Sequence, residues 1–244
     1  IWIKLFAIIQ FCGAYFIGLN FHLKSINSLN TTEKKVLLTF DDGPHPVLTA
    51  QLLDLLKQEN IQATFFVLGK NVKANSGLLA RAVQEGHLIG NHSYDHSDFH
   101  SLSEQDQINQ VSATDHLLNP YIRDPHLFRY PYGNSTCFSN QKVHNMGYAG
   151  IVGWHIDSCD WAFAANGGFV TDKQAKICEV LPQNKANFAA HVLQQVGQYN
   201  GGVILMHDIH QNTVDNAQEI IFRLKKAGYS FMNLDNPKTQ IFLK

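Results

Sequence analysis

Apolar runs that suit buried strands alternate with helical patterns along most of this 244-residue chain, and this alternation constrains the fold more than any other feature. Strands are predicted at residues 34–40, 62–69, 87–93, 126–133, 148–157 and 201–208. Amphipathic helices are predicted at residues 45–60, 76–86, 103–119, 139–147, 187–197 and 215–228. Such alternation is typical of α/β proteins in which helices cover parallel strands, as a barrel or a doubly wound sheet.

Ionisable side chains gather where the predicted strands end. Asp41 and Asp42 follow the first strand inside "LLTFDDGP", and His92 and His96 follow the third. Later strand ends carry Arg129, Asp157, Asp160, His207 and Asp208. In a parallel barrel the carboxyl ends of all strands open on one face, where active sites are built. We therefore expect these side chains to form one site.

The segment "HSYDH" carries two histidines four residues apart, His92 and His96. On a helical turn this spacing places both imidazoles on one side, where they could bind one cation. The chain has 13 histidines, so a chance pair at this spacing is the competing interpretation. A carboxylate from another strand end would complete a three-ligand centre with open positions, which is the usual design of a catalytic zinc site.

Two adjacent aspartates, Asp41 and Asp42, could divide the work of metal-assisted hydrolysis. Such chemistry needs one carboxylate that binds the ion and a separate base that takes a proton from water. An ordinary Asx turn would explain Asp42 before Gly43, but it gives Asp41 no reason to end a buried strand.

Two further pairings are possible at this face. Arg129 in "RYPYG" could pair with the base carboxylate and hold it in place. Asp157 could hold His207 and favour its protonated form, and a protonated histidine can deliver a proton to a leaving amine. Each residue alone also has an ordinary structural interpretation. Arg129 could be a surface arginine in a turn, and His207 could be a hydrogen-bonded histidine at the end of a strand.

In this order, the segments "TFDDGP", "HSYDH", "RYPYG", "DSCDW" and "LMHD" resemble the five motifs of the polysaccharide deacetylase family, carbohydrate esterase family four. The resemblance covers about residues 35–234, and five motifs in the family's order and spacing make it specific. It implies a distorted (β/α)7-type barrel and a divalent metal, Zn²⁺ or another such as Co²⁺. It also implies hydrolytic removal of N-acetyl groups from polysaccharides that contain N-acetylglucosamine, and we favour peptidoglycan as the substrate.

The resemblance assigns a role to each motif residue. Asp41 resembles the general base, and Arg129 resembles the residue that orients it. His207 resembles the general acid, tuned by Asp157. The other roles are those of the metal ligands Asp42, His92 and His96, the oxyanion-binding backbone N–H of Tyr132, and the walls of the acetyl-methyl pocket, Trp161 and Leu205.

Three alternative functions stay open from the sequence. They are deacetylation of chitin oligosaccharides, O-acetyl ester hydrolysis on xylan, and glycan binding by an inactive module of the same fold. The complete motif set argues against the inactive module, because an inactive relative usually loses a base or a ligand. A formal net charge of −1 without a basic run argues against a nucleic-acid partner, whereas a neutral glycan needs no cationic surface.

The sequence departs from the family pattern at several points. Tyr130 stands where family members often have a second proline, and Cys159 is unexpected inside the fourth motif. Cys159 could pair with Cys137 or Cys178, or simply pack. The connection over residues 162–199 is longer than the family leads us to expect, and an insertion beside the active face could shape substrate choice.

An apolar segment precedes the motifs. Residues 5–21 carry no charge and resemble a signal-peptide core or a membrane anchor, but Gln10, Gly13, Gly18 and Asn20 weaken a spanning helix. We expect residues 1–34 to form an N-terminal extension, either an anchor or a segment packed on a catalytic domain at residues 35–244. We also expect an extracytoplasmic monomer that acts on a polysaccharide and meets a membrane only through the extension.

Overall fold

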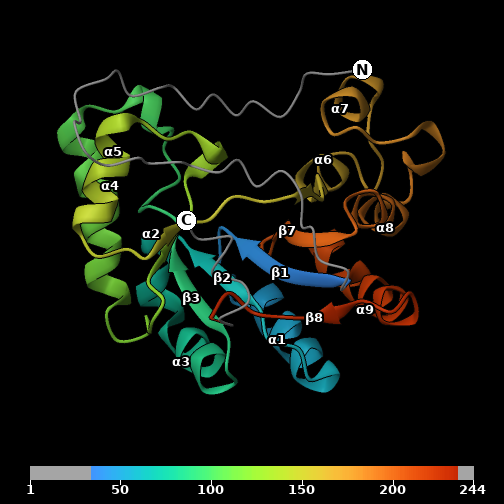
Figure 1. Ribbon diagram of the computed structural model, residues 1–244, viewed down its shortest axis with the longest axis horizontal. Coiled ribbons are helices and arrows are strands. Elements are labelled where there is room, and N and C mark those ends of the chain that lie inside the picture. The colour runs from blue at the N-terminus through green and yellow to red at the C-terminus, as the bar shows by residue number, and fades with distance from the viewer. Residues whose placement is uncertain (1–33, 236–244) are drawn as a thin grey trace.

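A sheet of eight strands, all paired in parallel, runs through the computed structural model, which describes residues 34–235 (Figure 1). The strand order is β5-β4-β3-β2-β1-β7-β6, and β8 pairs with the start of β1. The strands are β1 (Lys35–Asp41), β2 (Thr64–Val67), β3 (Leu88–Asn91), β4 (Leu127–Phe128), β5 (Gly150–Ile151), β6 (Ile156–Asp157), β7 (Gly201–His207) and β8 (Ser230–Phe231). The predicted α/β fold with a distorted barrel is confirmed.

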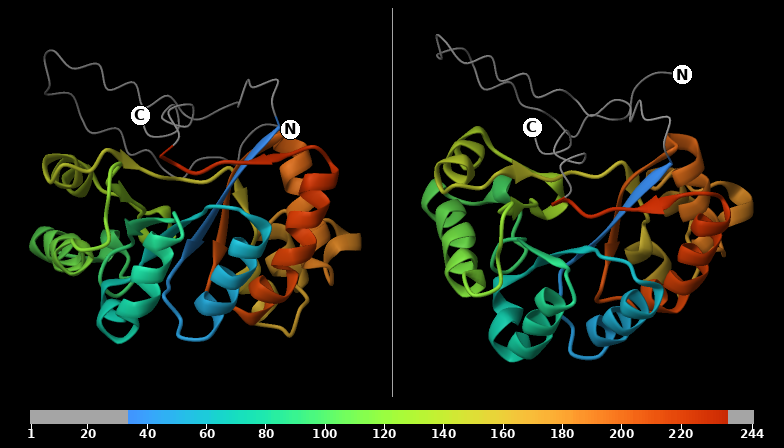
Figure 2. Two further views of the ribbon diagram at one scale, coloured as in Figure 1. Left: turned by 90° about the horizontal axis from the view of Figure 1, so that it is seen from below. Right: turned by 60° about the horizontal axis from the view of Figure 1, so that its bottom comes forward.

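Helices connect the strands and pack outside the sheet, as α1, α3 and α9 show in Figure 2. The α-helices are α1 (Leu48–Glu59), α2 (Gly69–Val72), α3 (Ser76–Gln84), α4 (Glu104–Leu118), α5 (Cys137–Asn145), α6 (Asp160–Ala164), α7 (Asp172–Ile177), α8 (Phe188–Tyr199) and α9 (Gln211–Lys226). Short 3-10 turns lie at η1 (Lys73–Asn75), η2 (Phe99–Ser101), η3 (Pro131–Gly133) and η4 (Pro182–Asn184). The helix predicted at residues 103–119 is confirmed as α4, and the Ser103 hydroxyl caps it by accepting the Asp106 N–H.

The central strand β1 is buried on both faces, which explains its unbroken apolar run. Val36, Leu38 and Phe40 belong to the large core that also takes side chains of the outer helices. Leu37 points to the opposite face and packs with a smaller cluster that includes Phe66 and Val203. Two separate cores therefore hold β1 in place, and its carboxyl end is rigidly positioned.

The predicted strand at residues 148–157 is wrong as a single element. The structure has two short strands there, β5 and β6, which pair with β4 and β7 near opposite edges of the sheet. Between these strands, carbonyl groups of the chain accept hydrogen bonds from a side chain. Arg129 donates Nε–H to the Val152 carbonyl at 3.1 Å and Nη2–H to the Gly153 carbonyl at 3.0 Å.

A disulfide joins Cys159 to Cys178, one of the alternatives that the sequence left open. Cys159 immediately precedes α6, and Cys178 ends α7, so the bond ties the first part of the long connection to the fourth motif. The predictions for residues 1–33, which concern the apolar extension, lie outside the described residues, as does the fourth cysteine, Cys12. Within residues 34–235, no helix has both the length and the apolar character needed to cross a membrane.

Candidate active site

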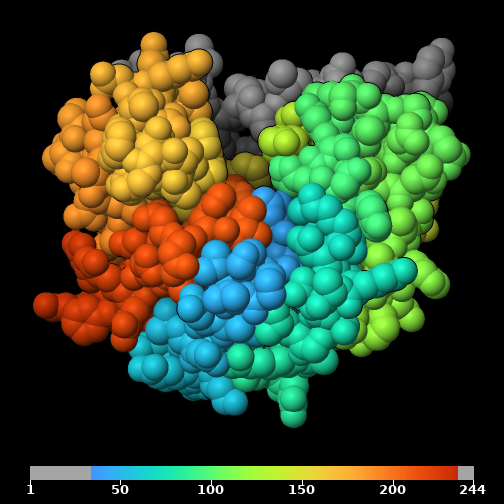
Figure 3. All heavy atoms as spheres, turned by 180° about the vertical axis from the view of Figure 1, so that it is seen from behind, coloured from blue at the N-terminus to red at the C-terminus, as the bar shows by residue number. Residues whose placement is uncertain are grey.

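Ionisable residues of all five motifs meet at the carboxyl end of the sheet. The parallel register places Asp41 opposite His207 on β7 and opposite Phe66 on β2, while Asn91 at the end of β3 pairs with Phe128, next to Arg129. Figure 3 views this face, which is hollowed between the green region of α4 and the gold region of α6 and α7. The blue end of β1 and the loop after it lie on the floor of this hollow.

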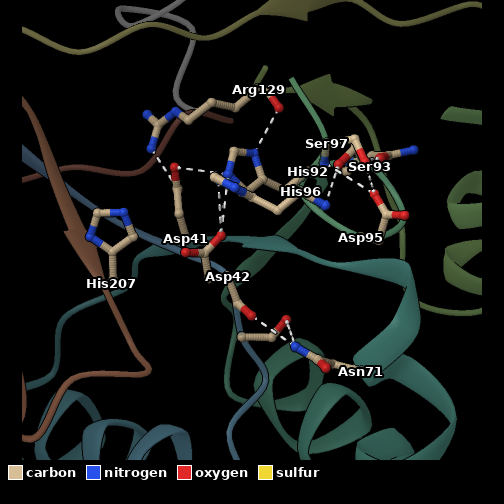
Figure 4. A network of polar contacts seen from close by, with 12 residues as sticks. Asp41, Asp42, Asn71, His92, Ser93, Asp95, His96, Ser97, Arg129 and His207 are labelled. Carbon is tan, nitrogen blue, oxygen red and sulfur yellow. Dashed lines mark hydrogen bonds and ion pairs between the residues drawn. The ribbon is translucent and has the colours of Figure 1, made fainter. Parts of the chain in front are cut away.

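Asp42, His92 and His96 form a group that suits a divalent cation. Their ligand atoms lie within 4.8 Å of one another, with Asp42 Oδ1 3.5 Å from His92 Nε2 and 3.4 Å from His96 Nε2 (Figure 4). Asp42 Oδ1 is buried and has no hydrogen-bond donor among the described residues. A cation between these atoms would satisfy that oxygen, and one carboxylate with two imidazoles is a donor set that zinc accepts.

The protonation of His92 also fits this role. Its Nδ1 lies 2.7 Å from the Arg129 carbonyl oxygen, which assigns the ring proton to Nδ1 and leaves the Nε2 lone pair facing Asp42. Burial lowers the pKa of His92 to about 3, against an opposing effect of Asp42, so the ring is neutral at neutral pH.

The loop with both histidines is not the helical turn that their spacing predicts. Ser93 and His96 have φ values of 70° and 72°, in the left-handed region. Two local hydrogen bonds support this loop: the Ser93 N–H donates to Asn91 Oδ1 at 2.9 Å, and the His96 N–H donates to Ser93 Oγ at 3.2 Å. The two rings still meet edge to face, with centroids 5.1 Å apart.

Asp41 and Arg129 form a buried ion pair. Arg129 Nη1 lies 2.7 Å from Asp41 Oδ1, and both side chains are almost completely shielded from solvent. The guanidinium also donates to Thr39 Oγ1 at 2.8 Å and stacks on Phe66, with 4.2 Å between its carbon and the ring centroid. Every nitrogen of Arg129 thus has a protein acceptor, so the charge is held in one orientation.

The second carboxylate oxygen of Asp41 faces the cation group. Asp41 Oδ2 lies 3.6 Å from His92 Nε2. Burial raises the pKa of Asp41, and the charge of Arg129 only partly offsets that effect. A carboxylate with a raised pKa, fixed on one oxygen and directed at the cation group with the other, has the properties of a general base.

Asp157 is not the hydrogen-bond partner of His207, contrary to the sequence prediction; Asp160 is. His207 Nδ1 lies 2.7 Å from Asp160 Oδ1, and the His207 backbone N–H donates to Asp160 Oδ2 at 2.6 Å. Asp157 Oδ1 instead accepts the Cys159 N–H at 2.8 Å. The physical reason is that the chain bends between the two aspartates: Cys159 is left-handed, with φ 53°, and Asp160 starts α6 beneath the end of β7.

Asp160 keeps His207 protonated. Burial alone would lower the pKa of His207, but the charge of Asp160 and its hydrogen bond outweigh burial and raise the pKa to about 10. Thr213 Oγ1 donates to Asp160 Oδ2 at 2.6 Å, and the Trp161 N–H donates to Oδ1 at 2.9 Å. The fully buried carboxylate is therefore saturated with donors, and His207 is a positively charged donor near Asp41.

The remaining predicted residues lie around these groups. The Tyr132 ring meets the His96 ring edge to face, with centroids 4.5 Å apart, and Tyr132 itself is left-handed with φ 58°. Trp161 is 38% exposed in the first turn of α6, and Leu205 is buried in β7 opposite Asp157. The oxyanion and acyl-pocket roles of these three residues stay predictions.

Several residues of the site went unassigned in the sequence. The motif "DSCDW" contains two acids, and the sequence prediction chose Asp157 for His207, whereas the tertiary structure pairs His207 with Asp160. Thr213 stands in no motif, and Thr39 opens the segment "TFDDGP" but received no role there. Gln110 of α4 accepts the backbone N–H groups of Tyr94 and Asp95, and it too lacks a local signature.

Comparison with known proteins gives consistent matches. The family model described as "Polysaccharide deacetylase" matches residues 28–151. Peptidoglycan-N-acetylglucosamine deacetylase PgdA of Listeria monocytogenes is 36% identical over 207 residues, which are 84% of this chain and 39% of that protein. Peptidoglycan-N-acetylmuramic acid deacetylase PdaC of Bacillus subtilis is 32% identical over 208 residues, 85% of this chain and 39% of that protein. The chain thus spans about two fifths of the length of these relatives.

Among solved structures, the T48 deacetylase with substrate is similar, with a TM-score of 0.68 and 34% sequence identity. The match covers 86% of this chain and 92% of that one.

Proposed function

Since this chain belongs to the polysaccharide deacetylase family, we propose that it hydrolyses the N-acetyl groups of N-acetylglucosamine in peptidoglycan. The observation that carries the proposal is the arrangement of three groups at one face of the sheet. The first is the cation group of Asp42, His92 and His96. The second is the buried Asp41 carboxylate, which Arg129 holds, and the third is the charged His207, which Asp160 holds. The names of the relatives favour peptidoglycan over other acetylated glycans.

The cation is proposed to be zinc, held by Asp42, His92 and His96. When bound, such an ion polarises the acetyl carbonyl and makes water more acidic. The fit rests on the unpaired Asp42 Oδ1 and on the neutral His92 ring.

Asp41 acts as the general base in this proposal. Its free oxygen takes a proton from the attacking water, while Arg129 holds the other oxygen and keeps the carboxylate oriented. The Tyr132 backbone N–H would stabilise the negative charge that develops on the acetyl oxygen. Trp161 and Leu205 would enclose the acetyl methyl group.

His207 acts as the general acid. Its raised pKa keeps it protonated, and it donates that proton to the amine of the sugar as the carbon–nitrogen bond breaks. Asp160 keeps the charge on the imidazole and fixes the ring through Nδ1, so that Nε2 is the donor to the substrate. The products are acetate and a glucosamine residue with a free amine.

Acetate release from purified peptidoglycan, with and without a chelator, tests this function. Chitin oligomers and acetylated xylan serve as the alternative substrates, and mass spectrometry of digested peptidoglycan tells which sugar loses its acetyl group. Chelator-sensitive release from N-acetylglucosamine of peptidoglycan is expected. Release confined to N-acetylmuramic acid, chitin or xylan would reassign the substrate, and binding without release would indicate an inactive glycan-binding module. Given the substrate, we place the protein outside the cytoplasm, and we expect a monomer.

A further inference from the structure

Both loops that carry the cation ligands contain left-handed residues that are not glycine. Asp42 has a φ of 75° in the first loop, and Ser93 and His96 have φ values of 70° and 72° in the second. The Cβ atom makes this conformation unfavourable, so it persists only where the surroundings over-determine it. Other parts of the chain must therefore hold these two loops in place.

One short segment, Leu68–Asn71, contacts both loops, and we name it the bridging segment. It consists of Leu68, the single residue between β2 and α2, and the first three residues of α2. The Leu68 N–H donates to the Gly43 carbonyl at 3.1 Å, in the loop of Asp42. The Gly69 and Lys70 N–H groups donate to the Ser93 and Tyr94 carbonyls, each at 3.0 Å, in the loop of the two histidines.

The side chain of Asn71 makes the contact nearest to a ligand. Its Nδ2 donates to the Asp42 carbonyl at 2.8 Å and approaches the Gly43 carbonyl at 3.4 Å (Figure 4). Asn71 thus holds Asp42 by its backbone carbonyl, which points away from the carboxylate that faces His92 and His96. Rotation of that peptide out of the left-handed conformation would break the 2.8 Å bond and turn the carboxylate away.

Gly69 shows how closely the bridging segment is packed. A Cβ at this position would collide with the Thr114 hydroxyl of α4 and with the Tyr94 ring. The segment therefore has no room to shift toward α4 or toward Tyr94, and its backbone hydrogen bonds to Ser93 and Tyr94 keep it from moving away.

We propose that Asn71 is a positioning residue of the cation site, whose side-chain amide holds the Asp42 peptide so that the carboxylate points at His92 and His96. It needs no contact with substrate or with the ion. The inference rests on the proposed function only in requiring that Asp42, His92 and His96 bind a divalent cation. It extends that function by naming a residue that determines how well the ion is held.

The test is zinc affinity of the metal-free protein, measured by competition with a chromophoric chelator. Loss of an outer partner of a metal ligand typically weakens metal binding by roughly 10–100-fold, and we expect this for Asn71→Ala. Asn71→Asp has the same shape but donates no hydrogen bond from its carboxylate, and its added negative charge would by itself favour a cation. Weaker zinc binding by both variants would therefore identify the lost donor as the cause.

Asn75→Ala is the matched control. Asn75, at the end of η1 one turn further along the chain, is another partly buried asparagine. Its Nδ2 donates to the Pro44 and Asn71 carbonyls and not to that of Asp42. We expect its zinc affinity to stay close to that of the wild type, and thermal unfolding of the metal-free proteins verifies that each variant folds.

Two results would overturn the inference and are distinguishable. Tight zinc binding by the wild type that neither Asn71 variant weakens would remove the role of Asn71 and leave the proposed function intact. A wild-type protein that binds no divalent cation would remove the proposed cation site and the role of Asn71 with it. If Asn71→Ala does not fold, Asn71→Asp alone decides between these results.

Discussion

His207 contacts Asp160 through two of its groups at once: the imidazole Nδ1 lies 2.7 Å from Oδ1, and the backbone N–H donates to Oδ2 at 2.6 Å. One carboxylate thus orients both the ring and the strand end that carries it. Asp160 is fully buried and also accepts a hydrogen bond from Thr213, so its negative charge is compensated within the protein and not by solvent. This relationship determines both the protonation and the orientation of the His207 imidazole, the proposed general acid.

Replacement of Asp160 should impair proton donation by His207. In Asp160→Asn the charge that raises the pKa of His207 is lost, so we expect kcat to fall by roughly 10²–10⁴-fold, the usual contribution of a general acid. The alkaline limb of the pH profile should move to lower pH. Asp157→Asn is the matched control and should change kcat far less, because Asp157 accepts a backbone N–H and not the imidazole. A larger loss in Asp157→Asn than in Asp160→Asn would contradict the pairing.

The charge of His207 should also appear in the pH dependence of stability. The folded-state pKa is about 10, above the ordinary value of 6.5, so folding favours the protonated form. Its stabilising contribution is fully present below pH 6.5 and is lost as pH rises through about 10. Urea unfolding of the metal-free protein across this range should show that decline, and His207→Ala should flatten it. An identical slope in both proteins would mean that His207 does not carry the charge.

The two adjacent aspartates should differ in what their loss removes. Asp41→Asn should keep zinc but lower kcat by roughly 10²–10⁴-fold, because an amide cannot take up a proton from water. Asp42→Ala should weaken zinc binding itself, since it removes a ligand. Zinc content and turnover, measured on the same samples, separate the two effects, and thermal unfolding checks the loss of the Arg129 ion pair. Retention of zinc by Asp42→Ala together with its loss from Asp41→Asn would reverse the assigned roles.

Removal of the cation should abolish activity reversibly. The donor set of two imidazoles and one carboxylate favours zinc or cobalt, whereas calcium and magnesium prefer sites made of oxygen. We therefore expect zinc or cobalt, and not magnesium, to restore acetate release to a chelated and dialysed sample. Full activity of a sample verified to be metal-free would rule out the cation in the mechanism.

The acyl pocket should discriminate by size. If Leu205 and Trp161 enclose the acetyl methyl, one extra methylene should cost about 1–3 kcal/mol in the transition state. Leu205→Ala should narrow the gap in kcat/KM between acetyl and propionyl glucosamine oligomers and slow acetyl turnover, because the smaller group is less firmly placed. An unchanged ratio in the variant would show that Leu205 does not form the pocket wall.

Local patterns along the chain are enough to predict the layer arrangement and the face on which the site forms. Continuous apolar runs such as residues 34–40 are local patterns, and their alternation with helices leaves few arrangements other than a covered parallel sheet. Because parallel strands share a direction, residues that end the runs, such as Asp41 and His207, were expected together, and the register places them opposite each other.

The pairing of these residues depends on contacts between distant segments. Residues 148–157 look like one strand, yet the structure has two short strands there, and Arg129 donates to the Val152 and Gly153 carbonyls between them. The sequence prediction paired His207 with Asp157, whereas a left-handed Cys159 brings Asp160 to His207. The positioning of Asp42 by Asn71 joins segments 29 residues apart. Strand and helix patterns depend on neighbouring residues, whereas hydrogen bonds between loops depend on backbone turns and on distant segments that local patterns do not encode.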